Sequence, residues 1–130
     1  MNFAATMPLA GTLGVTIDEA SRDRVAGKLP VRPEICTAGN IVHGGAIMAL
    51  ADSAGGAAAF ANLPQGSGGT STIESKTNFL GAVREGTVTA TAKPLHIGGS
   101  TIVIETELRN DTGKLVGKVT QTQTVLRPRA

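Results

Sequence analysis

The chain has 130 residues, a formal net charge of +2, one cysteine and only 2% aromatic residues, with no Trp or Tyr. This length is typical of one domain, and we take residues 1–130 as a single domain with its own core. The small charge and the scarcity of stacking aromatics argue against a protein that binds nucleic acid. A single cysteine precludes an intramolecular disulfide, which favours a reducing compartment and predicts a cytoplasmic protein.

Neither a membrane segment nor a metal site is expected. Residues 1–8 lack the basic region and the long apolar region of a signal peptide. The Ala-rich stretch after Gly45 is interrupted by Asp52 and by several glycines, so it does not indicate a membrane span. Two histidines and one cysteine, without a cysteine cluster, do not suit a structural zinc site.

The N-terminal segment predicts a loose lead-in followed by a β-hairpin. Residues 1–10 form the lead-in, with at most a short helical turn. Apolar and polar residues alternate over residues 13–18 and again over residues 24–31, which predicts two strands. The turn between them is expected at residues 18–22.

One long helix is expected in the middle of the chain. The second strand ends at a pair of prolines, and residues 32–42 predict an irregular segment. Residues 44–61 then predict a helix whose apolar side chains cover most of its circumference, so we expect it to be buried. Asn62 and Pro64 end it.

Four further extended segments follow the helix, separated by loops. The run from Asn110 to Gly113 is a strong hairpin-turn signal, because Gly supplies a positive φ. Two strands, one helix and then four strands predict an α+β fold, in which an antiparallel sheet wraps round the helix. The four expected strands span residues 70–80, 87–95, 101–110 and 114–126.

Asp52 is the one ionisable residue of the predicted helix, and its neighbours are small or apolar. A carboxylate in such surroundings is a candidate nucleophile or general base. Gly44 lies at the start of the same helix, where free backbone N–H groups and the positive end of the helix dipole are available. The two residues together suggest a reaction site.

One copy of the helix holds Gly44 and Asp52 too far apart to act on the same group. Eight residues at about 1.5 Å per residue separate them by roughly 12 Å along the axis. An oxyanion donor and the attacking or basic group must both lie within about 3 Å of the reacting group. Two antiparallel copies related by a twofold axis would bring Gly44 of one chain to Asp52 of the other. If these residues form one site, the chain is therefore at least a dimer with two equivalent sites.

Two runs around the start of the predicted helix carry a resemblance: His43-Gly44-Gly45, and then Ala49-Leu50-Ala51-Asp52. They resemble the hotdog-fold acyl-CoA thioesterases of the 4-hydroxybenzoyl-CoA and phenylacetyl-CoA types. The similarity continues through residues 72–80 and 94–98, and it covers about residues 12–126. This resemblance implies the hotdog fold, a six-stranded antiparallel sheet around one long central helix. It also implies a homodimer or a dimer of dimers (a homotetramer), an acyl-CoA substrate, and no metal or other cofactor.

The resemblance also assigns roles within the site. In such enzymes the acid on the helix attacks the thioester carbonyl or activates a water, and this acid corresponds to Asp52. The backbone N–H that polarises the carbonyl corresponds to Gly44. His43 is expected to shape the loop and to contact substrate, although taken alone it is better explained as a cap or packing residue at the helix entry. Thr37 stands where the family often has Asn or Gln, and Thr72 stands where some relatives carry a hydroxyl that positions the water. The expected substrate-binding residues are Gly45, Asn78, His96 and Gly98.

We therefore expect hydrolysis of an acyl-CoA thioester to a free acid and coenzyme A. The alternative among enzymes is a hotdog hydratase or dehydratase, but its usual Asp with a His five residues later is absent, because Ala57 holds that position after Asp52. The alternative outside enzymes is a non-catalytic acyl-CoA-binding module. The sequence leaves open whether the acyl group is aryl, short-chain or medium-chain.

Overall fold

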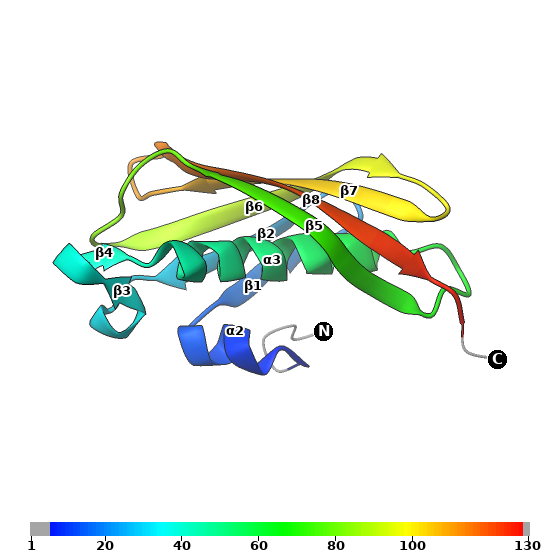
Figure 1. The fold of residues 1–130 in the computed structure, drawn as a ribbon, viewed down its shortest axis with the longest axis horizontal. Helices are drawn as coiled ribbons and strands as arrows, with labels where there is room; N and C mark the ends of the chain where they lie inside the picture. The colour runs from blue at the N-terminus through cyan, green and yellow to red at the C-terminus, as the bar shows by residue number, and fades with distance from the viewer. Residues whose placement is uncertain (1–5, 129–130) are drawn as a thin grey trace.

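Six antiparallel strands and one long helix make up the structure, a computed structural model that describes residues 6–128 (Figure 1). The strand order is β1-β2-β6-β7-β8-β5, so β1 and β5 are the two edges of the sheet. Helix α3 lies along one face of this sheet, which confirms the predicted α+β architecture. The elements of this layer are β1 (Thr16–Ala20), β2 (Val25–Pro30), α3 (Gly44–Ala61), β5 (Gly69–Phe79), β6 (Thr87–Ile97), β7 (Thr101–Arg109) and β8 (Leu115–Leu126).

The core between α3 and the sheet is aliphatic. The largest fully buried apolar side chains come from both layers: Leu50 from the helix, Leu29 from β2, and Ile102, Ile104 and Leu108 from β7. On the helix, buried alanines let the backbone approach the sheet closely, which suits a chain with few large side chains. The predicted helix bounds, residues 44–61, are confirmed.

The helix is largely buried, as expected, but part of its surface stays exposed in the single chain. Met48 is 39% exposed and Phe60 is 49% exposed, and Asp52 between them is also exposed. Asp52 borders the sheet here, since its carboxylate reaches Thr72 of β5. The sequence pattern suggested burial because the exposed part also carries small and apolar residues where an exposed helix face usually carries charges.

The segment before β1 is a short helix that begins in the expected lead-in, where a helical turn was allowed, and takes in the first residue of the predicted strand. Residues Pro8–Leu13 form helix α2, so Leu13 does not belong to the strand expected over residues 13–18. Proline in the first helical turn and Gly14 as a left-handed C-cap, with φ of 91°, are ordinary start and stop signals for a helix. Here they outweigh the apolar alternation. Residues 1–5 of the predicted lead-in lie outside the described residues.

The first hairpin turn lies further along the chain than residues 18–22, where it was expected. Strand β1 continues to Ala20, and the N–H of Ser21 donates to the C=O of Arg24 at 2.9 Å. The Ser21 hydroxyl also bonds to Arg24, which favours Ser at the first turn position.

The segment predicted as irregular contains short elements that fix the start of α3. Strand β3 (Cys36–Thr37) pairs with β4 (Ile41–Val42), and two 3₁₀ turns, η1 (Pro33–Ile35) and η2 (Ala38–Asn40), flank β3. The N–H of His43 donates to the C=O of Ile35 at 2.9 Å, which ties the first residue before α3 back to η1.

Strand β5 carries a β-bulge opposite the middle of α3. The register against β8 shifts between Thr72 and Glu74, so Thr72 opposes Gln123 while Ser75 opposes Gln121. The extra residue, Ile73, is 61% exposed. A bulge re-aims the side chains beside it, and here the Thr72 side chain reaches α3.

Asn62 ends α3 and ties it to the first hairpin. Its buried Nδ2 donates to the C=O of Ala58 at 2.9 Å and to the C=O of Arg22 at 2.8 Å. We expect Asn62→Ala to lower the free energy of unfolding by about 1–3 kcal/mol, because both carbonyls lose their donor. Urea denaturation followed by circular dichroism measures the change. The exposed loop variant Gln65→Ala should stay within about 0.5 kcal/mol of wild type, and equal losses in the two variants would contradict the assignment.

Candidate functional site

His43 caps the start of α3. Its Nδ1 accepts a hydrogen bond from the N–H of Gly45 at 3.1 Å. An accepting Nδ1 assigns the proton of the neutral ring to Nε2, and the side chain is exposed. The capping interpretation of His43, suggested by the sequence alone, is therefore the one that this geometry supports.

The N–H of Gly44 is available to a ligand. At the first helical position it has no acceptor within the helix, and the backbone hydrogen bonds of residues 6–128 outside regular elements include none from it. The Phe79 ring packs directly beside Gly44, because a Cβ built on this glycine would lie 3.0 Å from Phe79 Cζ. A cavity of about 390 Å³ opens there, lined by Thr37, Ile41, Ile47 and neighbouring residues. A free N–H at the positive end of a helix thus adjoins a mainly apolar cavity.

Asp52 lies two helical turns beyond Gly44 on the exposed part of α3. The expectation of an enclosed acid is wrong for the single chain, since Asp52 is exposed. Its Oδ1 lies 3.4 Å from Thr72 Oγ1 and 3.5 Å from Gln121 Nε2. One side of the carboxylate therefore faces polar side chains from β5 and β8, and the other side is open.

Two buried glutamines beside this carboxylate were missed by the sequence analysis. Gln121 is 0% exposed and Gln123 is 2% exposed, and Gln121 Nε2 donates to Gln123 Oε1 at 2.8 Å. Gln123 Nε2 donates in turn to Thr70 Oγ1 at 3.1 Å. A sequence signal was present, because both glutamines fall on the inward positions of the alternating β8 strand together with Val119. Amide side chains at core positions are uncommon and need an explanation.

A single chain does not bring Gly44 and Asp52 together. Both lie on the one continuous helix α3, so the separation of roughly 12 Å along its axis stands. The structure does bring Asp52 to Thr72, and it brings Thr37 to the cavity beside Gly44. The proposed donor and the proposed acid therefore belong to two separate regions of the same protomer.

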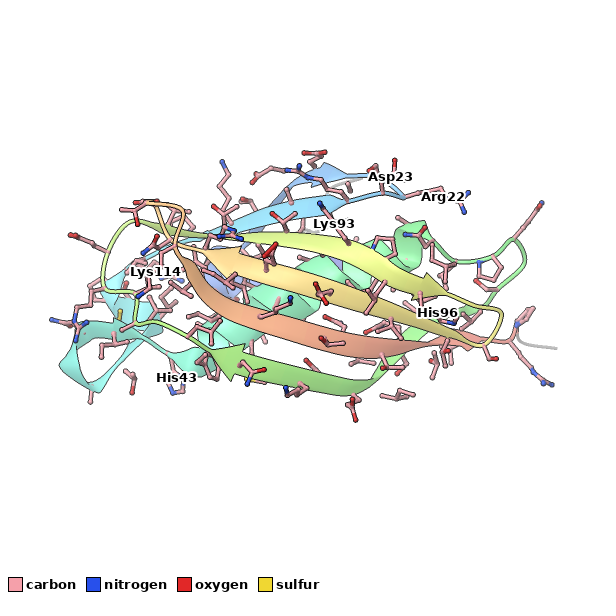
Figure 2. All side chains as sticks on the ribbon, turned by 90° about the horizontal axis from the view of Figure 1, so that it is seen from above. Arg22, Asp23, His43, Lys93, His96 and Lys114 are labelled. Carbon is pink, nitrogen blue, oxygen red and sulfur yellow. The ribbon has the colours of Figure 1, made fainter. Side chains whose placement is uncertain are left out.

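The remaining expected substrate-binding residues are spread along the molecule. Asn78 is exposed on β5 beside Phe79 and accepts a hydrogen bond from Lys76 Nζ at 2.9 Å. Gly45 lines a second cavity of about 280 Å³ on another side of the helix start, together with His43. His96 and Gly98 lie near the turn between β6 and β7, and Figure 2 shows His96 at the end of the molecule opposite to His43. Within one chain, neither His96 nor Gly98 is recorded in contact with Asp52 or Gly44 among residues 6–128.

The described residues also bear on a metal site, a membrane-spanning helix and a free thiol. No group of three or more His, Cys, Asp or Glu side chains within residues 6–128 is arranged to hold a metal ion. In the same part of the chain, each helix is too short or too polar to cross a lipid bilayer. The thiol of Cys36 is free and lies 3.5 Å from the C=O of Arg32.

Comparison with known proteins assigns the chain to a family. Residues 39–117 match the family described as the thioesterase superfamily. A Mycobacterium tuberculosis protein with an esterase name is 32% identical over 115 residues, which cover 87% of this chain and 82% of that protein. Its solved structure is similar with a TM-score of 0.90 at 29% identity, covering 95% of this chain and 99% of that chain.

Two further similarities carry more specific names. The 1,4-dihydroxy-2-naphthoyl-CoA hydrolase of Escherichia coli is 28% identical over 107 residues, which cover 82% of this chain and 78% of that protein. A crystal structure of a thioesterase from Haemophilus influenzae is similar with a TM-score of 0.86 at 28% identity, covering 92% of this chain and 82% of that chain.

Proposed function

Because the chain belongs to the thioesterase superfamily, we propose that it hydrolyses an acyl-CoA thioester to the free acid and coenzyme A. The chain has the hotdog fold of this superfamily, and its thioesterase-named neighbours support thioester hydrolysis as the reaction class. The name of the E. coli relative, an acyl-CoA hydrolase, supports acyl-CoA as the substrate. We also propose that residues 1–130 act as one domain in the cytoplasm, where reducing conditions suit a free Cys36.

The observation that carries this proposal is the placement of the Asp52 carboxylate. It is the one ionisable group on α3, it is open on one side, and polar side chains from two strands stand behind it. A carboxylate that only stabilised the helix surface would need no such support from the sheet. This arrangement suits a group that must keep one orientation while its free side reacts.

The proposed chemistry adds water across the C–S bond of the thioester. Asp52 either removes a proton from the attacking water or attacks the carbonyl carbon itself, forming an anhydride that water then opens. In both routes the Gly44 N–H stabilises the negative oxygen that forms on the carbonyl, and the thiol of coenzyme A leaves. We assign the orienting of the water to the Thr72 hydroxyl, which lies 3.4 Å from Asp52 Oδ1.

The proposed site requires a second copy of the chain. The outer edge of β5 has no neighbouring strand among residues 6–128, and most of this strand is exposed. Two copies that pair their β5 edges across a twofold axis would continue the sheet and set their α3 helices side by side, covering Met48 and Phe60. This brings Gly44 of one protomer near Asp52 of its partner, either in a homodimer or within a dimer of dimers. We propose six further residues as contacts of the substrate across this interface: His43, Gly45, Thr37, Asn78, His96 and Gly98.

A panel of acyl-CoA thioesters tests the proposed reaction. We expect release of the coenzyme A thiol, detected with a thiol-reactive dye, from at least one aryl, short-chain or medium-chain substrate. An enoyl-CoA hydration assay on the same protein should show no reaction. Hydration without thiol release would favour a hydratase, and binding of acyl-CoA without either reaction would favour a binding module; each result would contradict the proposal.

A further inference from the structure

The side-chain amide of Gln121 lies directly behind the Asp52 carboxylate. Its Nε2 is 3.5 Å from Asp52 Oδ1 and 2.8 Å from Gln123 Oε1. An amide nitrogen carries two protons, so Gln121 can serve both acceptors at once. The distance to Asp52 is long, as is common for catalytic hydrogen bonds before substrate binds.

The Thr72 hydroxyl cannot replace Gln121 as this donor while it is bonded to Gln123. Thr72 Oγ1 lies 2.5 Å from Gln123 Oε1 but 3.4 Å from Asp52 Oδ1. A hydroxyl has one proton to donate, and the shorter contact takes it. Thr72 then offers its lone pairs to a water, and the amide of Gln121 is the donor left for Asp52.

The other end of the Gln121 amide is a buried oxygen against the helix. Its Oε1 is buried and has no hydrogen-bond partner among the described residues. It lies against Gly55 of α3, where a Cβ would come within 2.0 Å of the oxygen. A glycine inside a helix and an unpaired buried carbonyl are both unfavourable for folding. An apolar side chain at position 121 would remove the unpaired carbonyl.

We propose that Gln121 is a positioning residue for Asp52, and that Gly55 provides the space its amide needs. This inference rests on the proposed function, in which Asp52 is the reacting acid. The Thr72 hydroxyl and the Gln121 amide both lie nearest to Oδ1 of Asp52. Holding this oxygen leaves Oδ2 directed to the open side of the site, where the thioester and water arrive.

The variant Gln121→Met tests this role, because Met has a similar length and no amide. We expect kcat to fall about 10- to 100-fold, the range for losing a hydrogen bond to a charged group. The KM should change less than about twofold, since Gln121 does not touch substrate. The melting temperature should be unchanged or higher, because the variant removes an unpaired buried carbonyl. A structural role for Gln121 would instead lower stability and activity together.

Two other variants separate this role from general effects on the core. Gly55→Ala should also lower kcat, because its methyl group displaces the Gln121 amide while Ala favours the helix. Thr106→Val is the matched control: Thr106 is a 0% exposed residue of β7 whose Oγ1 is also unpaired, and no recorded contact joins it to Asp52. It should keep the wild-type kcat. Wild-type kcat in Gly55→Ala and Gln121→Met alike would overturn the inference.

A double-mutant cycle with Asp52→Asn identifies the path of the effect. If Gln121 acts through Asp52, adding Gln121→Met to Asp52→Asn should lower the residual kcat by less than about twofold. An equal loss in both backgrounds would overturn the inference. A wild-type rate in Asp52→Asn alone would refute the proposed function. An inactive Asp52→Asn together with a fully active Gln121→Met would refute only the positioning role of Gln121.

Discussion

Asp52→Asn should lower kcat for thioester hydrolysis by about two to four orders of magnitude, the range found when a general base is removed. The amide has the shape of the carboxylate but is neither a base nor a nucleophile. Because the side chain is exposed, the fold and the assembly should be preserved. Steady-state thiol release measures kcat, and circular dichroism with sedimentation measures fold and assembly. Asp23→Asn, an exposed residue of the first hairpin turn, should behave as wild type. Turnover by Asp52→Asn near the wild-type rate would contradict the assignment of Asp52.

The same residue allows the two chemical routes to be distinguished. Single-turnover hydrolysis in ¹⁸O-labelled water places the label in the released acid if Asp52 activates water. If Asp52 attacks the carbonyl and water opens the anhydride at its Asp52 carbonyl, the label enters the Asp52 carboxylate instead, and the released acid keeps an unlabelled oxygen from Asp52. Mass spectrometry of the peptide that contains Asp52 reads the outcome.

Gly44→Pro should lower kcat by about 10²- to 10³-fold, the usual effect of removing one oxyanion donor. Proline lacks the N–H, yet it is well tolerated at the first helical position. His43 has φ of −60° and ψ of 132°, which is the extended conformation required before proline. Gly44→Ala is the matched control, because its Cβ meets the Phe79 ring in the same way but the N–H is kept. Equal losses of kcat in the two variants would show that the ring contact, and not the N–H, is responsible.

Co-expression of the two inactive variants tests whether the site is shared between protomers. A mixed dimer of Asp52→Asn and Gly44→Pro chains has one site with both changes and one site with neither. Random assembly makes half of the dimers mixed, so the mixture should regain about a quarter of wild-type activity. Activity no higher than that of either variant alone would show that each site is built within a single chain.

The architecture was predictable because its signals are strong and local. The alanine-rich, apolar run of residues 44–61, with Asn62 after it, marks one helix, and the alternating segments after it mark strands of a sheet. The extent of the N-terminal helix α2 was not predicted, because Leu13 begins an alternating run, while the start signal Pro8 and the stop signal Gly14 lie on either side. Local patterns overlap there, and tertiary packing decides between them.

The acid of the site, Asp52, was predictable, but the side chain that contacts it from β8, Gln121, was not. Asp52 stands out as one charge in an apolar helix, so the sequence identifies it directly. Gln121 is almost seventy residues away along the chain, and it meets Asp52 only because β8 lies beside β5 under α3. Alternation shows that Gln121 faces inward, but it does not show which helix residue it faces. That pairing depends on the strand order and on the space left by Gly55.

The open edge of β5 also affects the behaviour of the protein at low concentration. Unpaired strand edges recruit other strands indiscriminately, and they are a common origin of fibrillar aggregates. Glu74 and Lys76 place charges along this edge, which discourage stacking of identical chains in register. If the proposed dimer forms, dilution that separates its protomers uncovers this edge, so loss of activity on dilution should become irreversible with time.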